Sequence, residues 1–161
     1  MLNKFNKEAQ KIISVTESIA FDLNYSVVGP EHLFLALLKD KKSMLREILL
    51  NYQITYEDVQ KQLILRDGVK ENQVYYMEYS KSLQNIMNKA VKYASENNKE
   101  KADIKSLIYC LLNEEPNLAT ETLAKNNISI KEIITFLDDS DEEDNYEGLL
   151  SEILDDESDA V

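Results

Sequence analysis

The second half of the chain repeats the first at an offset of 74 residues, the separation between Thr55 and Ser129. Apolar positions and helix-capping positions stay in phase across the two halves without a gap. Two unrelated helical stretches of similar composition would not keep both kinds of position in one register, so we predict an internal duplication. The matched pairs include Phe5 with Tyr79, Ile12 with Ile86, Ala20 with Ala94, Leu37-Leu38 with Leu111-Leu112 and Leu63 with Leu137.

The composition of both halves favours helices. The 161 residues include three Gly and two Pro, are rich in Leu, Ile, Glu, Lys and Asn, and show few strand-like alternations. We predict an all-α fold of two pseudo-symmetric four-helix repeats that form one eight-helix domain, followed by an acidic C-terminal tail. The predicted boundaries are 1–66 for repeat 1, 67–78 for a linker, 79–137 for repeat 2 and 138–161 for the tail.

The sharpest helix start in the chain is Gly29-Pro30-Glu31-His32, which precedes the apolar run from Leu33 to Leu38. Proline suits the first helical position, and Glu31 faces the positive end of the helix dipole. The following residues are apolar nearly all round, which predicts a buried, central helix. Repeat 2 has Asp103-Ile104-Lys105-Ser106 at these positions, so Lys105 reverses the charge of Glu31. Any specific function of the motif should therefore belong to repeat 1.

The net charge of −12 comes entirely from the tail, because residues 138–161 hold twelve of the thirty acidic residues and no Lys or Arg. The remaining chain carries eighteen charges of each sign, and no basic stripe with interleaved aromatic residues appears. We expect no nucleic-acid partner. No segment has the length of a signal sequence or a membrane span, which predicts a cytoplasmic protein without a membrane partner.

The tail also contains apolar residues at helical spacing, enough for a short amphipathic helix over 146–154. Alone, such a helix is too short to be stable in water. It could dock on its own domain, fold on the groove of a partner, or belong to a linker toward an ATPase module. We favour the partner, since a helix that only packs would not need acidic flanks on both sides. The candidate partner-binding residues are Tyr146, Leu149, Leu150, Ile153 and Leu154.

The side chains needed for most catalytic chemistry are scarce. The three glycines cannot build a phosphate-binding loop, so we predict that the chain does not itself bind and hydrolyse a nucleotide. One His and one Cys, far apart in the sequence, make a zinc site or a Cys-His nucleophile improbable. Cys110 is expected to be a buried small hydrophobe. We therefore predict no catalytic residue, no metal site and no cofactor.

Several of these features occur together in a known family. The pattern Phe5-x-x-x-Ala9-Gln10-Lys11-Ile12-Ile13, the run Gly29 to Leu38, the pair Ile54-Thr55 and the duplication resemble the Clp N-terminal repeat domain. That domain lies at the N-terminus of AAA+ protein unfoldases of the ClpA, ClpB and ClpC class. The resemblance covers about residues 3–137. It implies a small all-α module that binds adaptor or substrate proteins and hands them to a Clp ATPase or protease.

The resemblance also implies a ligand site. In ClpC-like members, the Glu of the Gly-x-Glu-His motif in each repeat contributes to a pocket for phosphorylated arginine. By motif position Glu31 takes this role here, aided by Asn6, and Phe5 and His32 complete the candidate ligand-binding residues. Lys105 replaces the second Glu, and Asn6 stands where those members have Thr, so at most one pocket is intact. Glu31 could instead serve only the helix dipole, and His32 could be a packed helix-start histidine.

The sequence thus predicts a non-catalytic protein-binding module of a Clp unfoldase–protease system. Two alternatives stay open: a sensor of modified arginine or another small ligand in a repeat-1 pocket, or a free-standing regulator that acts through its acidic tail. The solvated composition of the last residues favours a free-standing chain over the front end of a longer ATPase.

Overall fold

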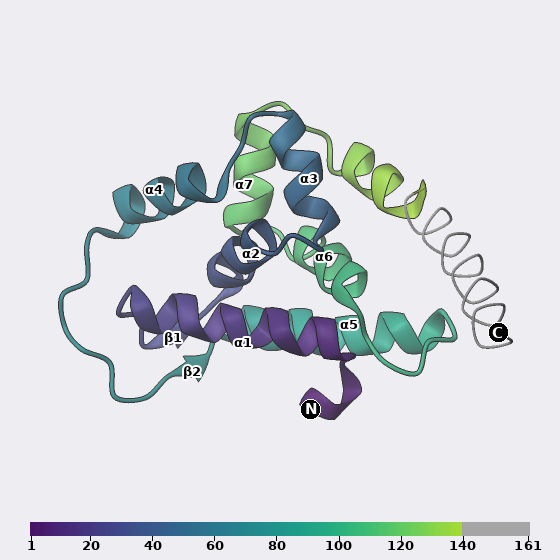
Figure 1. Cartoon of the computed structure of the whole chain (residues 1–161), viewed down its shortest axis with the longest axis horizontal. Helices are drawn as coiled ribbons and strands as arrows, with labels where there is room; N and C mark the ends of the chain where they lie inside the picture. Colours follow the sequence, from purple (N-terminus) through teal and green to yellow (C-terminus); the bar gives the residue numbers. More distant parts are fainter. Residues whose placement is uncertain (140–161) are drawn as a thin grey trace, which may run out of the picture.

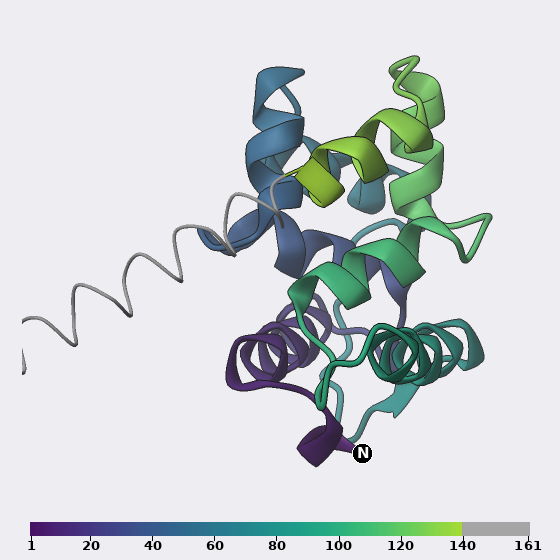
Figure 2. The same cartoon turned by 90° about the vertical axis from the view of Figure 1, so that its right-hand side faces the viewer.

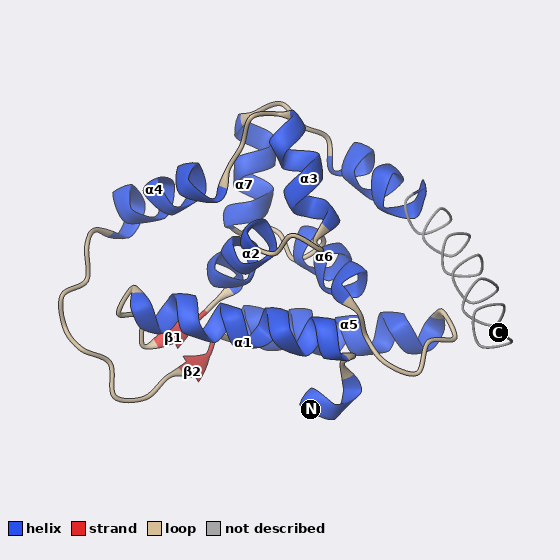
Figure 3. Cartoon of the chain, in the orientation of Figure 1, coloured by secondary structure: helices blue, strands red, loops and turns tan. Residues whose placement is uncertain are grey.

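The computed structural model describes residues 1–139, and nearly all the regular structure of this part is helical (Figures 1 and 3). A short 3-10 turn precedes the first α-helix, and two strands of two residues each lie between helices. A further helix over 130–139 continues to the end of the described chain. The labelled elements are η1 Leu2–Lys4, α1 Lys7–Asp22, β1 Val27–Val28, α2 Pro30–Lys39, α3 Met44–Asn51, α4 Tyr56–Asp67, β2 Glu78–Tyr79, α5 Lys81–Glu96, α6 Ile104–Leu112 and α7 Leu118–Lys125.

The two repeats begin and end their helices by the same local interactions. The side chain of Asn6 accepts a hydrogen bond from a backbone N–H three residues on, and Ser80 does the same before α5. Asparagine and glutamine tolerate the left-handed backbone conformation that closes a helix. Four residues just past helix ends have positive φ at matching positions of the repeats: Asn24 and Asn98, Gln53 and Asn127.

Each repeat pairs the segment before its own second helix with the first residues of the other repeat. In one pairing, β1 lies parallel to β2, with Val28 opposite Tyr79. In the other, Phe5 forms a parallel bridge with Ala102. These pairs are equivalent at the 74-residue offset, because Phe5 matches Tyr79 and Val28 matches Ala102. The backbone therefore crosses between the repeats twice, in a symmetric exchange.

The second helix of each repeat lies in the middle of the molecule. Eight of the ten residues of α2 and seven of the nine residues of α6 are buried. Figure 2 shows α1 and α5 below them and the remaining helices above. The buried apolar side chains of both repeats form one continuous core. The repeats thus share a single hydrophobic interior.

The predicted all-α fold with two four-helix repeats is confirmed: α1 to α4 form the first group, and α5, α6, α7 and the helix over 130–139 form the second. Cys110 is buried, as predicted, and burial raises the pKa of its thiol to about 11. The predicted helix over 146–154 lies outside the described residues. Within residues 1–139, no helix is long and apolar enough to cross a membrane.

Candidate functional site

The start of α2 is built around a glycine that gives space to a carboxylate. Gly29 has an extended backbone, with φ −124° and ψ −179°, which any residue can adopt. A Cβ at this position, however, would overlap the Glu31 carboxylate, which folds back over Gly29. The glycine is thus required by the position of the Glu31 side chain and not by the backbone conformation.

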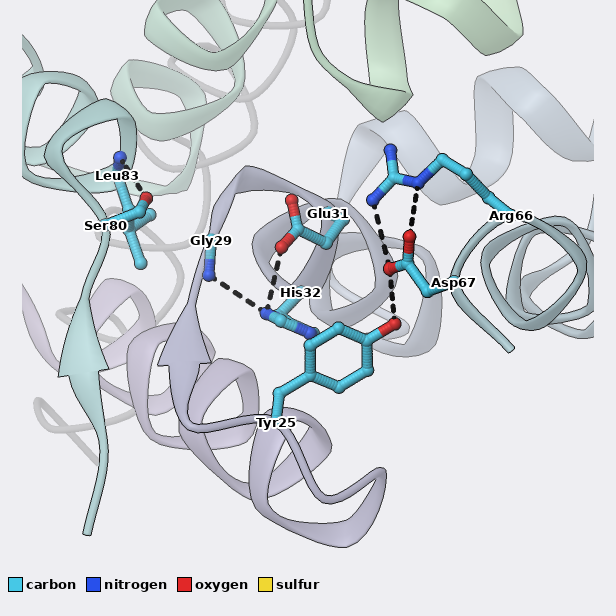
Figure 4. A network of polar contacts seen from close by, with 8 residues as sticks. All are labelled: Tyr25, Gly29, Glu31, His32, Arg66, Asp67, Ser80 and Leu83. Carbon is cyan, nitrogen blue, oxygen red and sulfur yellow. Dashed lines mark hydrogen bonds and ion pairs between the residues drawn. The ribbon is translucent and has the colours of Figure 1, made fainter. Parts of the chain in front are cut away.

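His32 closes the same turn from inside the protein. Its side chain is completely buried, and Nδ1 accepts a hydrogen bond of 2.9 Å from the Gly29 N–H (Figure 4). The Tyr25 ring lies edge to face with the imidazole at 4.5 Å. Burial, with a smaller effect of Arg66, lowers the pKa of His32 to about 4. The imidazole is therefore neutral at physiological pH and acts as a helix cap.

Glu31 is the polar group of this turn that reaches the surface. Its side chain is 20% exposed, and burial raises the pKa of the carboxyl above its ordinary value. Its one ion-pair contact among the described residues is with Nδ1 of His32 at 3.6 Å, and that imidazole is neutral. The structure thus leaves a partly desolvated carboxylate without a cationic side chain within 4.0 Å in residues 1–139.

A second group of polar residues fixes the surroundings of Glu31 (Figure 4). Asp67, at the end of α4, accepts hydrogen bonds from Arg66 at 3.0 and 3.3 Å and from the Tyr25 hydroxyl at 2.6 Å. The Arg66 bonds lower the pKa of Asp67, while burial and Asp67 raise that of Tyr25. The ammonium of Lys70 lies 4.9 Å from the centre of the Tyr25 ring. This network ties the end of repeat 1 to the start of α2.

The structure does not bring Phe5 and Asn6 together with Glu31 and His32. Phe5 is completely buried, and the Asn6 N–H donates to the carbonyl of Ala102, so both residues lie beside repeat 2. The exchange of segments between the repeats is the physical reason. At the repeat-1 site the position equivalent to Asn6 is held by Ser80, whose N–H donates to the Val28 carbonyl beside Gly29.

The equivalent turn in repeat 2 has different chemistry. Asp103 caps α6 by accepting from the N–H and hydroxyl of Ser106, both at 2.8 Å. Lys99 forms an ion pair with Asp103 at 2.9 Å. Lys105, which replaces the carboxylate of Glu31, forms an ion pair with Asp138 at 3.3 Å. In repeat 2 the charged side chains of this turn are therefore paired with opposite charges. In repeat 1 the Glu31 carboxylate has no such partner among the described residues within 4.0 Å.

Sequence reasoning missed four residues of the repeat-1 site: Tyr25, Arg66, Asp67 and Lys70. Tyr25 lies within predicted repeat 1, and the other three lie at its predicted end and in the predicted linker. The hydrogen bond between Tyr25 and Asp67 spans 42 residues, and no spacing rule connects such positions. The predicted tail residues Tyr146, Leu149, Leu150, Ile153 and Leu154 lie outside the described residues. Within residues 1–139, no cluster of side chains suited to a metal ion is present.

The fold and this turn define a double-repeat, all-α domain whose most distinctive polar feature is the start of one buried helix. A family model described as the Clp repeat (R) N-terminal domain matches residues 4–126, well over half of the chain. The chain belongs to the family of Clp repeat N-terminal domains, as its motifs predicted.

Individual relatives agree with this family. The ATP-dependent Clp protease ATP-binding subunit ClpC of Staphylococcus saprophyticus is 21% identical over 130 residues, which cover 81% of this chain and 16% of ClpC. The chain thus spans about one sixth of the length of the curated relatives it matches. The N-terminal domain of the chaperone ClpD from Arabidopsis thaliana is 17% identical and has a TM-score of 0.68, with 85% of this chain and 94% of that chain covered.

A second similar structure contains a bound peptide. The complex of the ClpV N-domain with VipB peptide has a TM-score of 0.55 and 22% identity, with 84% of this chain and 78% of that chain covered. At these identities, the likeness to ClpD and ClpV shows a common fold.

Proposed function

We propose that the chain is a cytoplasmic, non-catalytic module that recognises adaptor or substrate proteins for a Clp unfoldase–protease system. Membership of the Clp repeat family supports this proposal, as does the similarity to ClpC, an ATP-binding subunit of a Clp protease. The ClpV N-domain, which has the same fold, was solved with a peptide bound.

The observation that carries the proposal is the carboxylate of Glu31. Removing part of its hydration costs free energy, and no cationic side chain of the described residues lies within ion-pair distance of it, since Arg66 acts on it only from farther away. An arginine or lysine of a partner would supply the missing charge and form a charge-assisted hydrogen bond. The backbone of the turn presents the carboxylate at the surface before the partner arrives. We therefore assign Glu31 as the main contact for a basic group of the partner.

Affinity capture tests this function directly. The full chain is used as bait in a lysate of the source organism, beside Glu31→Gln, which keeps the size of the side chain, and Glu47→Gln, which changes an exposed carboxylate of α3. We expect the wild type and Glu47→Gln to recover a Clp ATPase, protease or adaptor, and Glu31→Gln to recover much less. Recovery of no Clp component by the wild type would contradict the proposal.

The same carboxylate favours a second function, recognition of a modified arginine as a free or peptide-bound ligand. A guanidinium group matches a carboxylate with two parallel hydrogen bonds. Calorimetry with phospho-arginine on the wild type and Glu31→Gln separates the two functions. Heat that Glu31→Gln abolishes would support the sensor. No heat with either protein would leave the recognition of whole proteins as the function.

A further inference from the structure

A groove between α1 and the end of α2 is the second notable surface feature of repeat 1. Its volume is about 500 Å³, and its apolar lining residues are Val15, which is partly exposed, and Ile19 and Ala36, which are buried. Four lysines and two aspartates line the rest of it. The lining residues are Lys11, Val15, Ser18, Ile19, Asp22, Ala36, Lys39, Asp40, Lys41 and Lys42.

The charges around the groove are predominantly positive. Lys42 contacts Glu8 at 3.3 Å, and Lys39 lies 5.7 Å from the centre of the Tyr56 ring. Lys11 and Lys41 are exposed and form no ion pair within residues 1–139. A groove with an apolar base and a lysine rim complements an amphipathic segment that is rich in acidic residues.

The comparison with repeat 2 shows that this surface is not a by-product of the fold. At the 74-residue offset, Lys41 becomes Glu115 and Lys11 becomes Asn85. Val15 becomes Lys89, whose ammonium pairs with Glu114 at 2.9 Å. The positive groove is therefore specific to repeat 1, although both repeats have the same helices.

We propose that this groove, and not the groove of a partner protein that the sequence favoured, receives residues 146–154 of the same chain, with their apolar side chains on Val15. This part of the tail carries apolar residues at helical spacing, and residues 138–161 have twelve acidic groups and no basic one. No other stretch of the chain combines these two properties. The proposal does not rest on the proposed function, because Glu31 lies at the opposite end of α2.

The segment is tethered to the described chain by a short connection. Six residues, 140–145, separate the described chain from the segment, and an extended connection of this length spans about 20 Å. In Figure 2 the helix over 130–139 ends near the start of α3. Because the segment is tethered, its effective concentration is about millimolar, which lets a weak site be occupied.

Tryptophan fluorescence of the full chain tests the proposal, since the chain contains no Trp. In Tyr146→Trp, we expect an emission maximum shifted to the blue of the same variant in denaturant, unchanged over a wide range of protein concentration. The shift should be lost in Lys11→Glu/Lys41→Glu and should decrease at high salt, which screens charges. Lys61→Glu/Lys125→Glu makes the same change in net charge outside the groove and should keep the shift.

Two further measurements make the outcome decisive. Val15→Lys introduces the residue of repeat 2 and should also remove the shift, while circular dichroism checks that each variant is folded. Emission typical of exposed Trp in Tyr146→Trp would overturn the proposal, as would a shift that survives both groove variants. A shift that grows with protein concentration would assign the groove to a second copy and would equally overturn it.

Discussion

At the scale of single residues, the start of α2 depends on three neighbours with different tasks. Gly29 leaves room for the Glu31 carboxylate, and its N–H is held by the neutral imidazole of His32. Because His32 takes the capping role inside the protein, Glu31 is free to face the surface. The charge of one residue and the neutrality of the other thus follow from their different burial.

The neutrality of His32 gives the first prediction. The imidazole should titrate near pH 4, well below the ordinary value of 6.5, because burial disfavours the cation. The unfolded chain binds the proton more tightly, so stability that is present above pH 6.5 is lost as the pH falls toward 4, by about 3 kcal/mol. His32 is the sole histidine, so NMR can follow its ring signals directly. Titration near pH 6.5 would show that the imidazole is not buried as described.

Gly29 gives the second prediction. Gly29→Ala should change the free energy of unfolding by no more than about 1 kcal/mol, because the backbone is extended and the Glu31 side chain can swing away. Binding of the captured Clp partner should nevertheless fall as it does in Glu31→Gln. Gly68→Ala is the contrasting change: its surroundings are open, but its φ of 77° and ψ of 169° lie in a region that is essentially restricted to glycine, which should cost about 1–3 kcal/mol. Chemical denaturation and calorimetry measure the two effects. Wild-type binding by Gly29→Ala would argue against Glu31 as the contact.

At the scale of elements, the exchange of N-terminal segments determines which residues meet. Phe5 is fully buried against repeat 2, and Tyr79 is half-buried against repeat 1, with its hydroxyl bonded to Glu17. The segment before α5 therefore completes the surroundings of the repeat-1 site, and the segment before α1 completes those of repeat 2.

The equivalent positions Phe5 and Tyr79 should differ in their contribution to stability. Phe5→Ala leaves a large cavity in the shared core and should lower the free energy of unfolding by about 3–5 kcal/mol. Tyr79→Ala should cost less, because part of this side chain already contacts solvent. Urea denaturation of both variants provides the comparison. A Phe5→Ala variant as stable as the wild type would mean that the Phe5 side chain does not pack in the shared core.

The sequence was sufficient to predict the helices, but it did not predict the exchange of N-terminal segments between the two repeats. Periodicity and capping residues such as Thr55 with Asp58 depend on neighbours within a few positions, and the structure shows their reciprocal hydrogen bonds. The bond between Tyr25 and Asp67 and the bridge between Phe5 and Ala102 join residues far apart in the chain. Asn6 was assigned to the wrong repeat because a duplication alone does not tell which copy completes a site.

At the scale of the whole molecule, one fold carries two different surfaces. The repeats share a core and their helix ends, yet repeat 1 presents the carboxylate of Glu31 while repeat 2 neutralises Lys105 with Asp138. A duplicated domain in which one copy binds and the other mainly supports it would have this asymmetry. The central claim is therefore that partner recognition is confined to repeat 1.

Amide chemical-shift mapping tests this claim most directly. The isotope-labelled full chain is titrated with the Clp partner that affinity capture recovers, with Glu31→Gln and Glu47→Gln as the site variant and the matched control. We predict shifts centred on residues 25–32 and 66–70, absent in Glu31→Gln and kept in Glu47→Gln, with residues 99–106 of repeat 2 unaffected. Shifts centred on repeat 2, or shifts that persist unchanged in Glu31→Gln, would contradict the account.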